Sequence, residues 1–225
     1  TLSDKFFSEV SEIFPGYEDK YAAIPNPNSY SEQELQSTIV PKKKQLLFVG
    51  LFGPPKREDR IVILWKRMFK DYLDWELIIV GDGERKRVER LKRMSSGIPN
   101  IRFEGFQNPL SYQQEASIFC MTSNYEGWGM VLTEAMQCGT VPIAFNSFAS
   151  VTDIISDGKT GLLVKPFDMR EYERKLRKLM DNDELRYKLS LNAKEEIKQK
   201  SVKNVVDRWE ALFNKLEIEK ADKNV

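Results

Sequence analysis

Short apolar runs alternate along this chain with longer stretches in which apolar residues recur every three or four positions. The stretches between the runs have the period of a helix that buries one face. The predicted helices are Arg60–Tyr72, Glu84–Ser95, Ser111–Ala116, Val131–Cys138 and Val151–Ser156. The apolar runs predict six strands, at Gln45–Gly50, Glu76–Val80, Ile101–Glu104, Ser117–Met121, Val141–Phe145 and Gly161–Val164. This alternation predicts an α/β fold, a doubly wound parallel sheet of about six strands with helices on both faces.

The two ends of the chain follow other patterns. After position 166 the pattern is wholly helical, which predicts a helical C-terminal tail. IPNPNSYSEQELQ and VPKKKQ, within the first 46 residues, are rich in proline and polar residues and predict a linker, with KKK at 42–44 as its solvated part. One helix and a short strand, Tyr21–Ile24, are predicted before it. We expect residues 1–40 to be the end of an N-terminal domain with its linker, 41–200 a compact domain, and 201–225 a helix that packs back toward the N-terminal domain.

Composition excludes several kinds of function. With 35 basic and 34 acidic residues the net charge is +1, which gives no general attraction to nucleic acid or membranes. The absence of histidine excludes Ser-His-Asp and Cys-His catalysis and histidine-ligated metals within this sequence. Cys120 and Cys138 lack Cys-x-x-Cys spacing and are predicted to be buried. We expect a cytoplasmic protein without a metal or cofactor; contact with the inner face of a membrane through KKK is an open alternative.

The loops after the predicted strands carry the candidate chemistry, because ligands of doubly wound sheets bind at the carboxyl ends of the strands. These loops are LFGPPKRED, GDGER, GFQNPL and TSNYEGWGM. Three similarities to phosphate-binding loops fail. GKT at 158–160 has Asp153 where a phosphate loop needs glycine, and GDGERK and GWGMVL have Lys86 and Leu132 in place of the third glycine of a dinucleotide motif.

The stretch EGWGMVLTE places two glutamates around a Gly-x-Gly, directly before a predicted helix. The backbone N–H groups of Gly127, Gly129 and Met130 are then available to an anion at the positive end of the helix. Glu126 can accept hydrogen bonds from sugar hydroxyls, and the two oxygens of Glu134 can hold a vicinal diol such as a ribose. The alternative is that Glu134 only complements the helix dipole and Glu126 is an exposed loop acid.

From residue 46 onward the chain resembles the C-terminal, donor-binding domain of GT-B fold retaining glycosyltransferases, specifically glycosyltransferase family 4 (glycosyl transferases group 1). LLFVG with PPK, LIIVGDGE, NIRFEGF, SNYEGWGMVLTEAMQCGTVPIAF and DGKTGLLVKPFD carry the resemblance, and the Glu-x7-Glu in the fourth is its most specific part. IPNPNSY is similar to the crossover between the two domains. The resemblance implies a Rossmann-like half of a GT-B fold. It also implies transfer of a sugar from a nucleotide diphosphate sugar to an acceptor hydroxyl, with retention, in cell-surface polysaccharide or lipopolysaccharide biosynthesis.

The resemblance also assigns residues. Glu126 would contact the transferred sugar, Glu134 the ribose, Lys56 the diphosphate, and the loop of Gly105, Phe106 and Gln107 the nucleobase. The residues implied in catalysis are Glu126 and Lys56, and those implied in donor binding are Gly50, Arg57, Gly105, Phe106, Gln107, Gly127, Trp128, Gly129, Met130, Val131 and Glu134.

Two positions depart from the family pattern. Leu51 occupies the arginine position of the family's G-R-x-x-x-x-K, where Arg57 is one way to compensate. At 146–153, NSFASVTD stands in place of the family's N-x-x-G-G-x-P-E, so that Asp153 only approximates the family acid. The acceptor, a sugar or a lipid-linked sugar, would bind on an N-terminal domain outside this sequence, so we expect this chain alone to be inactive. A nonenzymatic nucleotide-sugar sensor, favoured by Leu51, and a GT-B epimerase, disfavoured by Glu-x7-Glu, are the alternatives. The base, sugar, acceptor and oligomeric state stay open.

Overall fold

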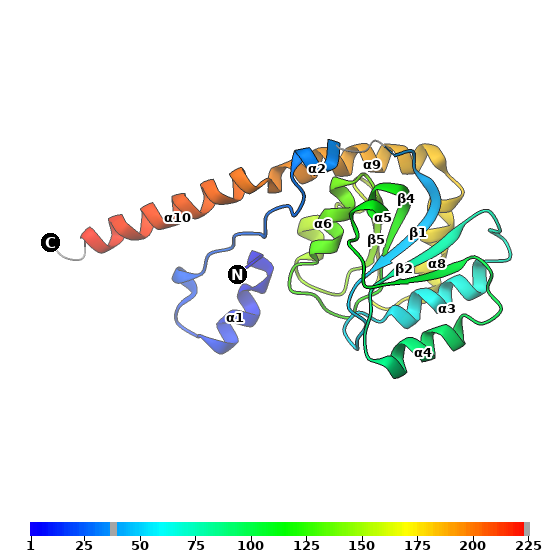
Figure 1. Ribbon diagram of the computed structural model, residues 1–225. Coiled ribbons are helices and arrows are strands. Elements are labelled where there is room, and N and C mark those ends of the chain that lie inside the picture. The colour runs from blue at the N-terminus through cyan, green and yellow to red at the C-terminus, as the bar shows by residue number, and fades with distance from the viewer. Residues whose placement is uncertain (37–39, 223–225) are drawn as a thin grey trace.

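The structure is a computed structural model that describes residues 1–36 and 40–222. A six-stranded sheet forms its centre, in the order β3-β2-β1-β4-β5-β6 (Figure 1). The strands are β1 (Lys43–Val49), β2 (Glu76–Val80), β3 (Ile101–Gly105), β4 (Ala116–Met121), β5 (Val141–Phe145) and β6 (Leu162–Val164). Every neighbouring pair is parallel. The prediction of a doubly wound α/β fold is therefore confirmed, and the strand order reverses between β1 and β4.

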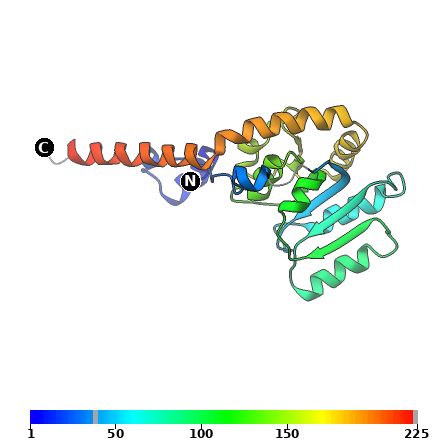
Figure 2. The same ribbon diagram turned by 45° about the horizontal axis from the view of Figure 1, so that its top comes forward.

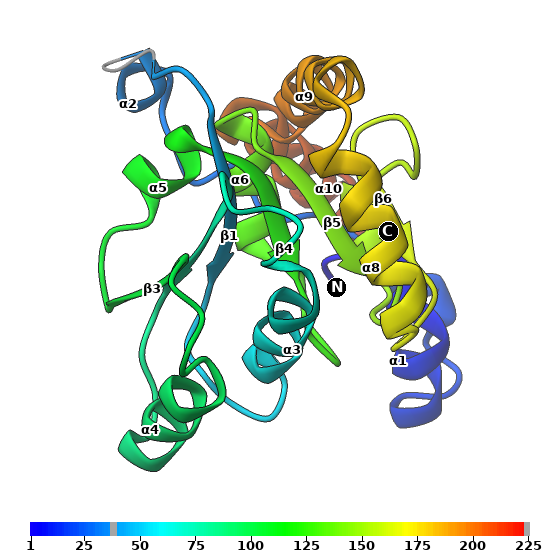
Figure 3. The same cartoon turned by 90° about the vertical axis from the view of Figure 1, so that its right-hand side faces the viewer.

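Helices cover both faces of the sheet (Figure 3). Alternate strand residues point to opposite faces, so Leu46 and Phe48 join one buried cluster and Leu47 the other. The first cluster packs under α3 (Glu58–Met68), α4 (Arg85–Met94) and α8 (Met169–Met180). The second packs under α6 (Met130–Gln137), α7 (Val151–Ile154) and α9 (Asp183–Ile197). Because both faces are covered, the central strands β4 and β5 are buried along their whole length. β1 starts with exposed lysines, and the edge strand β3 carries Arg102 and Glu104.

Most predicted helices lie where the periodicity placed them, including α5 (Leu110–Glu115). The predicted helix Arg60–Tyr72 is the least accurate, since α3 begins at Glu58 and ends at Met68. Glu58 is fully buried, and its carboxylate accepts a hydrogen bond from the backbone N–H of Gly53 at 3.2 Å. This contact between the first turn of α3 and the loop before it is not part of a helical pattern, so periodicity does not predict it.

The N-terminal segment departs from prediction in two places. It contains α1 (Phe7–Ile13), α2 (Glu32–Gln36) and two short 3-10 turns, but Tyr21–Ile24 is not a strand. It forms no strand ladder: Ile24 N–H donates to the carbonyl of Thr1 at 2.9 Å, and the carbonyl of Ala23 accepts a hydrogen bond from Arg208 at 3.0 Å. The KKK stretch is not a solvated linker either. Its second and third lysines begin β1, and their ammonium groups pair with Glu115 and Asp74.

The last helix, α10 (Val202–Asp222), follows a short 3-10 turn and extends away from the sheet (Figures 1 and 2). Trp209 is 44% exposed on α10, and its ring lies 5.6 Å from that of Phe213, measured between centroids. Cys120 and Cys138 are free and buried, as predicted. Within residues 1–36 and 40–222, no helix is long and apolar enough to cross a membrane.

Candidate functional site

Two loops at the strand reversal, one after β1 and one after β4, are tied to each other. The backbone N–H of Asn124 donates to the carbonyl of Pro55 at 2.7 Å, and the Thr122 hydroxyl donates to the carbonyl of Arg57 at 2.9 Å. These bonds fix Lys56, which lies between Pro55 and Arg57, and Glu126 follows two residues after Asn124.

The loop after β2 supports the same place from the other side. Gly81 has φ +141°, and a Cβ atom there would lie 1.9 Å from the carbonyl oxygen of Gly50. Only glycine allows the backbone of the two loops to approach so closely. Gly50 is thereby fixed directly beneath Lys56, whose Cδ atom lies 3.7 Å from the position of an added Gly50 Cβ.

Lys56 and Glu126 form an ion pair at the carboxyl ends of β1 and β4. The Lys56 ammonium lies 2.7 and 2.8 Å from the two carboxylate oxygens, and the Ser123 hydroxyl donates to one of them at 2.7 Å. The Glu126 side chain is 11% exposed and that of Lys56 is 26% exposed. The structure therefore brings the two predicted catalytic residues together, 70 residues apart in the chain.

The Gly-x-Gly loop leads directly into α6. Gly129 is the residue before the helix, with φ +90°, and no side chain caps the first turn. Ser150 donates a hydrogen bond to the carbonyls of Gly127 and Trp128, at 3.0 and 3.2 Å, which pins the loop. Among the described residues, no acceptor is bonded to the backbone N–H of residues 130 and 131. This helix terminus can therefore bind an anion, and the neighbouring carboxylate of Glu126 lies in the same loop.

Glu134 contacts the linker rather than the Lys56–Glu126 pair. The Ser29 hydroxyl donates to one Glu134 oxygen at 2.8 Å, and the Gln113 amide donates to the other at 3.4 Å. Gln113 is fully buried, and its side-chain oxygen accepts a hydrogen bond from the Tyr30 hydroxyl at 2.7 Å. Burial raises the pKa of Tyr30, so the phenol stays a donor. Sequence reasoning missed Ser29, Tyr30 and Gln113, because nothing local marks a linker residue as the partner of a distant glutamate.

The remaining predicted site residues lie around these groups. Gly105 has φ +71°, its carbonyl accepts a hydrogen bond from Gly81 N–H at 2.7 Å, and the following Phe106 is 83% exposed, with Gln107 also exposed. Trp128 is 4% exposed and lines a cavity of about 300 Å³ beside Asp153.

The two departures from the family pattern have defined surroundings. Asp153 pairs with Lys5 of the N-terminal segment, and Leu51 is 70% exposed. Arg57 donates two hydrogen bonds to Asp59, at 2.9 and 3.0 Å, which raise the pKa of Arg57. The structure thus pairs Arg57 with Asp59 and not with Glu126. In the part of the chain that the structure describes, no three His, Cys, Asp or Glu side chains form a metal-binding group.

An open parallel sheet with charged side chains and a free helix terminus at its strand reversal defines a Rossmann-like ligand-binding domain. A profile of the family "Glycosyl transferases group 1" matches residues 30–196, so this chain belongs to that family. Its fold is that of one half of a GT-B glycosyltransferase.

Two curated relatives and one solved structure illustrate the similarity. An uncharacterized glycosyltransferase of Haemophilus influenzae is 27% identical over 195 residues, which make up 85% of this chain and 54% of that protein. A poly(ribitol-phosphate) α-N-acetylglucosaminyltransferase of Staphylococcus aureus is 26% identical over 164 residues, 72% of this chain and 33% of that protein. The crystal structure of a TarM variant of S. aureus with UDP and α-GlcNAc-glycerol has a TM-score of 0.82 at 21% identity. It covers 95% of this chain and 43% of that one, and shows a shared fold. The chain thus spans a third to about half of the length of these curated relatives.

Proposed function

We propose that this chain binds a nucleotide diphosphate sugar and is the donor-binding half of a retaining glycosyltransferase. The observation that carries the proposal is the Lys56–Glu126 pair at the strand reversal, next to an uncapped helix terminus. A cation, free N–H groups and a carboxylate in one place match a ligand that joins a diphosphate to a sugar. Membership of the group 1 family supports the same reading.

Each group has a separate part in this proposal. The Lys56 ammonium and the N–H groups at the start of α6 bind the diphosphate, whose negative charge grows as the bond to the sugar breaks. Glu126 turns from Lys56 to the sugar hydroxyls, while Ser123 keeps one of its oxygens in place. Glu134 exchanges the Ser29 hydroxyl for the two hydroxyls of the ribose.

Transfer itself needs an acceptor, which we place on a domain outside this sequence. One of the relatives named above is a poly(ribitol-phosphate) α-N-acetylglucosaminyltransferase. We propose a related role for this protein in the assembly of a cell-surface polysaccharide or lipopolysaccharide, at the cytoplasmic side of the membrane. Leu51, an exposed apolar residue, favours as second candidate a protein that binds the nucleotide sugar without transferring it.

Calorimetric titration of the chain with UDP, GDP and ADP, without metal, tests donor binding. We expect one nucleotide to bind saturably. Glu134→Ala is expected to weaken that binding, whereas Glu89→Ala, which removes an exposed carboxylate from α4, leaves it unchanged. If all three nucleotides fail to bind while circular dichroism shows the fold intact, the proposed donor site is wrong. Sugar transfer by a longer protein that contains this chain separates the transferase from the binding-only candidate.

A further inference from the structure

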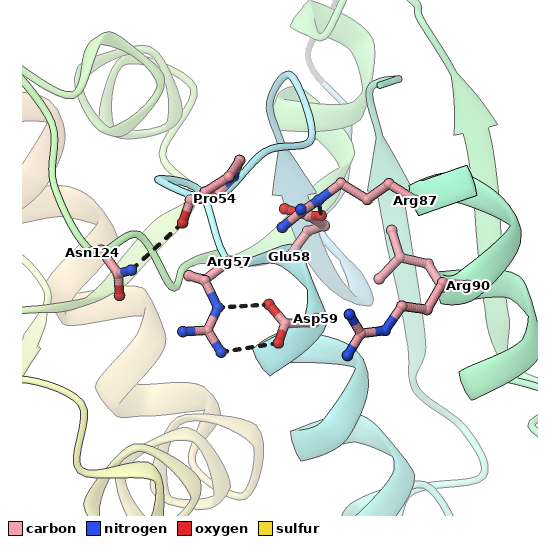
Figure 4. Close-up of a pocket in the computed structure, with 8 residues that line it drawn as sticks. Pro54, Arg57, Glu58, Asp59, Arg87, Arg90 and Asn124 are labelled. Carbon is pink, nitrogen blue, oxygen red and sulfur yellow. Dashed lines mark hydrogen bonds and ion pairs between the residues drawn. The ribbon is translucent and has the colours of Figure 1, made fainter. Parts of the chain in front are cut away.

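A cavity of about 350 Å³ lies beside the proposed donor site, between the loops after β1 and β4 and the helix α4. Figure 4 shows Arg87 and Arg90 reaching from α4 toward Glu58, Asp59 and Arg57. The cavity therefore brings three guanidinium groups and two carboxylates into one space. Which of these guanidinium groups are paired with a carboxylate decides whether the cavity can bind an anion.

Arg57 is held in place on the floor of this cavity. Its backbone has φ +50°, one of two positive values among the non-glycine residues that the structure describes. Such a conformation costs on the order of 1 kcal/mol for a residue with a side chain. Asp59 binds Nε and Nη2 of the guanidinium, and no acceptor in the described chain is bonded to Nη1. Arg57 is thus oriented before any ligand arrives and keeps unused N–H donors.

Arg87 is oriented in a similar way by a buried acid. Glu58 is fully buried and accepts hydrogen bonds from Nε of Arg87 and from the backbone N–H of Gly53. Both oxygens of the Glu58 carboxylate are therefore hydrogen-bonded within the protein. The terminal nitrogens of Arg87 have no acceptor within residues 1–36 and 40–222.

Arg90 has no acidic partner within 4.0 Å in the described part of the chain. Arg85, on the same helix, pairs with Glu89 at 2.9 Å, whereas Arg90 has no such partner. Three guanidinium groups against two carboxylates leave a net charge of +1 on the cavity lining.

We propose that this cavity binds a phosphate group of the acceptor. Planar guanidinium forks match the oxygens of phosphate, and several converging forks suit a phosphodiester, which presents two free oxygens. The positive end of α3, which begins at Glu58, adds to the attraction. Lys56 lies between two lining residues, Pro54 and Arg57, so the cavity adjoins the place assigned to the transferred sugar. That the bound phosphate belongs to the acceptor rests on the proposed function. That the cavity binds a phosphate does not.

Titrations of the chain at low ionic strength with inorganic phosphate and with dimethyl phosphate test the site, followed by calorimetry and by phosphorus NMR. We expect Arg90→Gln and Arg57→Gln each to weaken binding about ten-fold, the effect of losing one charge-assisted contact. Arg85→Gln is the matched control, because it removes the same charge from the same helix outside the cavity, and it should leave binding unchanged. Arg90 is exposed, so its substitution should not disturb the fold.

Four outcomes would overturn the proposal. Equal weakening by the control would mean a diffuse effect of charge, and unchanged binding in Arg90→Gln would mean that phosphate binds elsewhere. Competition between dimethyl phosphate and the nucleotide that binds at Glu134 would make the cavity part of the donor site. Binding of inorganic phosphate without dimethyl phosphate would exclude a phosphodiester acceptor. If phosphate binds here while no nucleotide binds, the phosphate site stands and the proposed donor function fails.

Discussion

Replacing Lys56 with methionine separates two roles that the ion pair with Glu126 combines. In the free protein the substitution leaves an acid that is 11% exposed with the Ser123 hydroxyl as its remaining side-chain donor. Loss of a partner from such a partly buried charge is expected to lower the unfolding free energy by about 1–2 kcal/mol. In the complex, the diphosphate loses a charge-assisted hydrogen bond worth roughly 1.5–3 kcal/mol, which weakens nucleotide binding about 10- to 150-fold.

The double variant Lys56→Met/Glu126→Gln distinguishes these roles. Neutralising the acid removes the unpaired charge, so urea denaturation should show most of the stability restored. Nucleotide affinity, measured by calorimetry, should stay low, because the diphosphate still lacks its cation. If the double variant regains wild-type affinity, Lys56 acts only by neutralising Glu126 and does not touch the nucleotide. If Lys56→Met alone binds normally, the assignment of Lys56 to the diphosphate is wrong.

Three further substitutions test other contacts. Ser29→Ala removes the hydroxyl that occupies Glu134 and should tighten nucleotide binding about five-fold, from a hydrogen bond of about 1 kcal/mol; weaker binding in calorimetry would mean that Ser29 positions Glu134 for the ribose. Gly81→Ala places a Cβ atom 1.9 Å from the carbonyl of Gly50 and should cost at least about 2 kcal/mol of unfolding free energy, so an unchanged denaturation midpoint would contradict the close contact. Burial of the Lys42 amino group lowers its pKa to about 7, so between pH 7 and 8.5 the unfolded chain binds a proton that the folded chain releases, and stability should rise with pH. Lys42→Met should flatten that rise in denaturation curves, and a slope equal to wild type would refute the lowered pKa.

The sequence predicted what is locally encoded and little that depends on distant neighbours. The strand at Glu76–Val80 was predicted without error. In a sheet covered on both faces a strand is a short, continuous apolar run between turn residues, and this segment has that pattern. The acidic pair and the glycines of the Gly-x-Gly loop were also found, since one segment carries them. The ion pair of Lys56 and Glu126 follows from the adjacency of β1 and β4, which alternation alone does not specify.

Other departures from the local pattern have the same origin in tertiary contacts. Lys42 looks like part of a polar linker, yet its ammonium donates to the Gln113 carbonyl at 3.0 Å and to the Thr140 hydroxyl at 2.7 Å. Arg57, named as a second cation for the diphosphate, is oriented by a left-handed backbone and by Asp59, and its part in donor binding stays a prediction. In each case the side chain is placed by a partner that the local pattern does not contain.

The four tryptophans lie in different surroundings, so intrinsic fluorescence can report ligand binding at the site. Trp65 and Trp75 are buried under the sheet, and Trp209 is exposed on the protruding helix, so their fluorescence should be insensitive to a ligand at the strand reversal. Trp128 is different, because it lies between the two glycines of the site loop with its indole N–H unbonded in the described structure. Emission from Trp128 should therefore change when a nucleotide binds beside that loop. A Trp209→Phe background would remove the exposed, red-shifted component and leave the site signal easier to read.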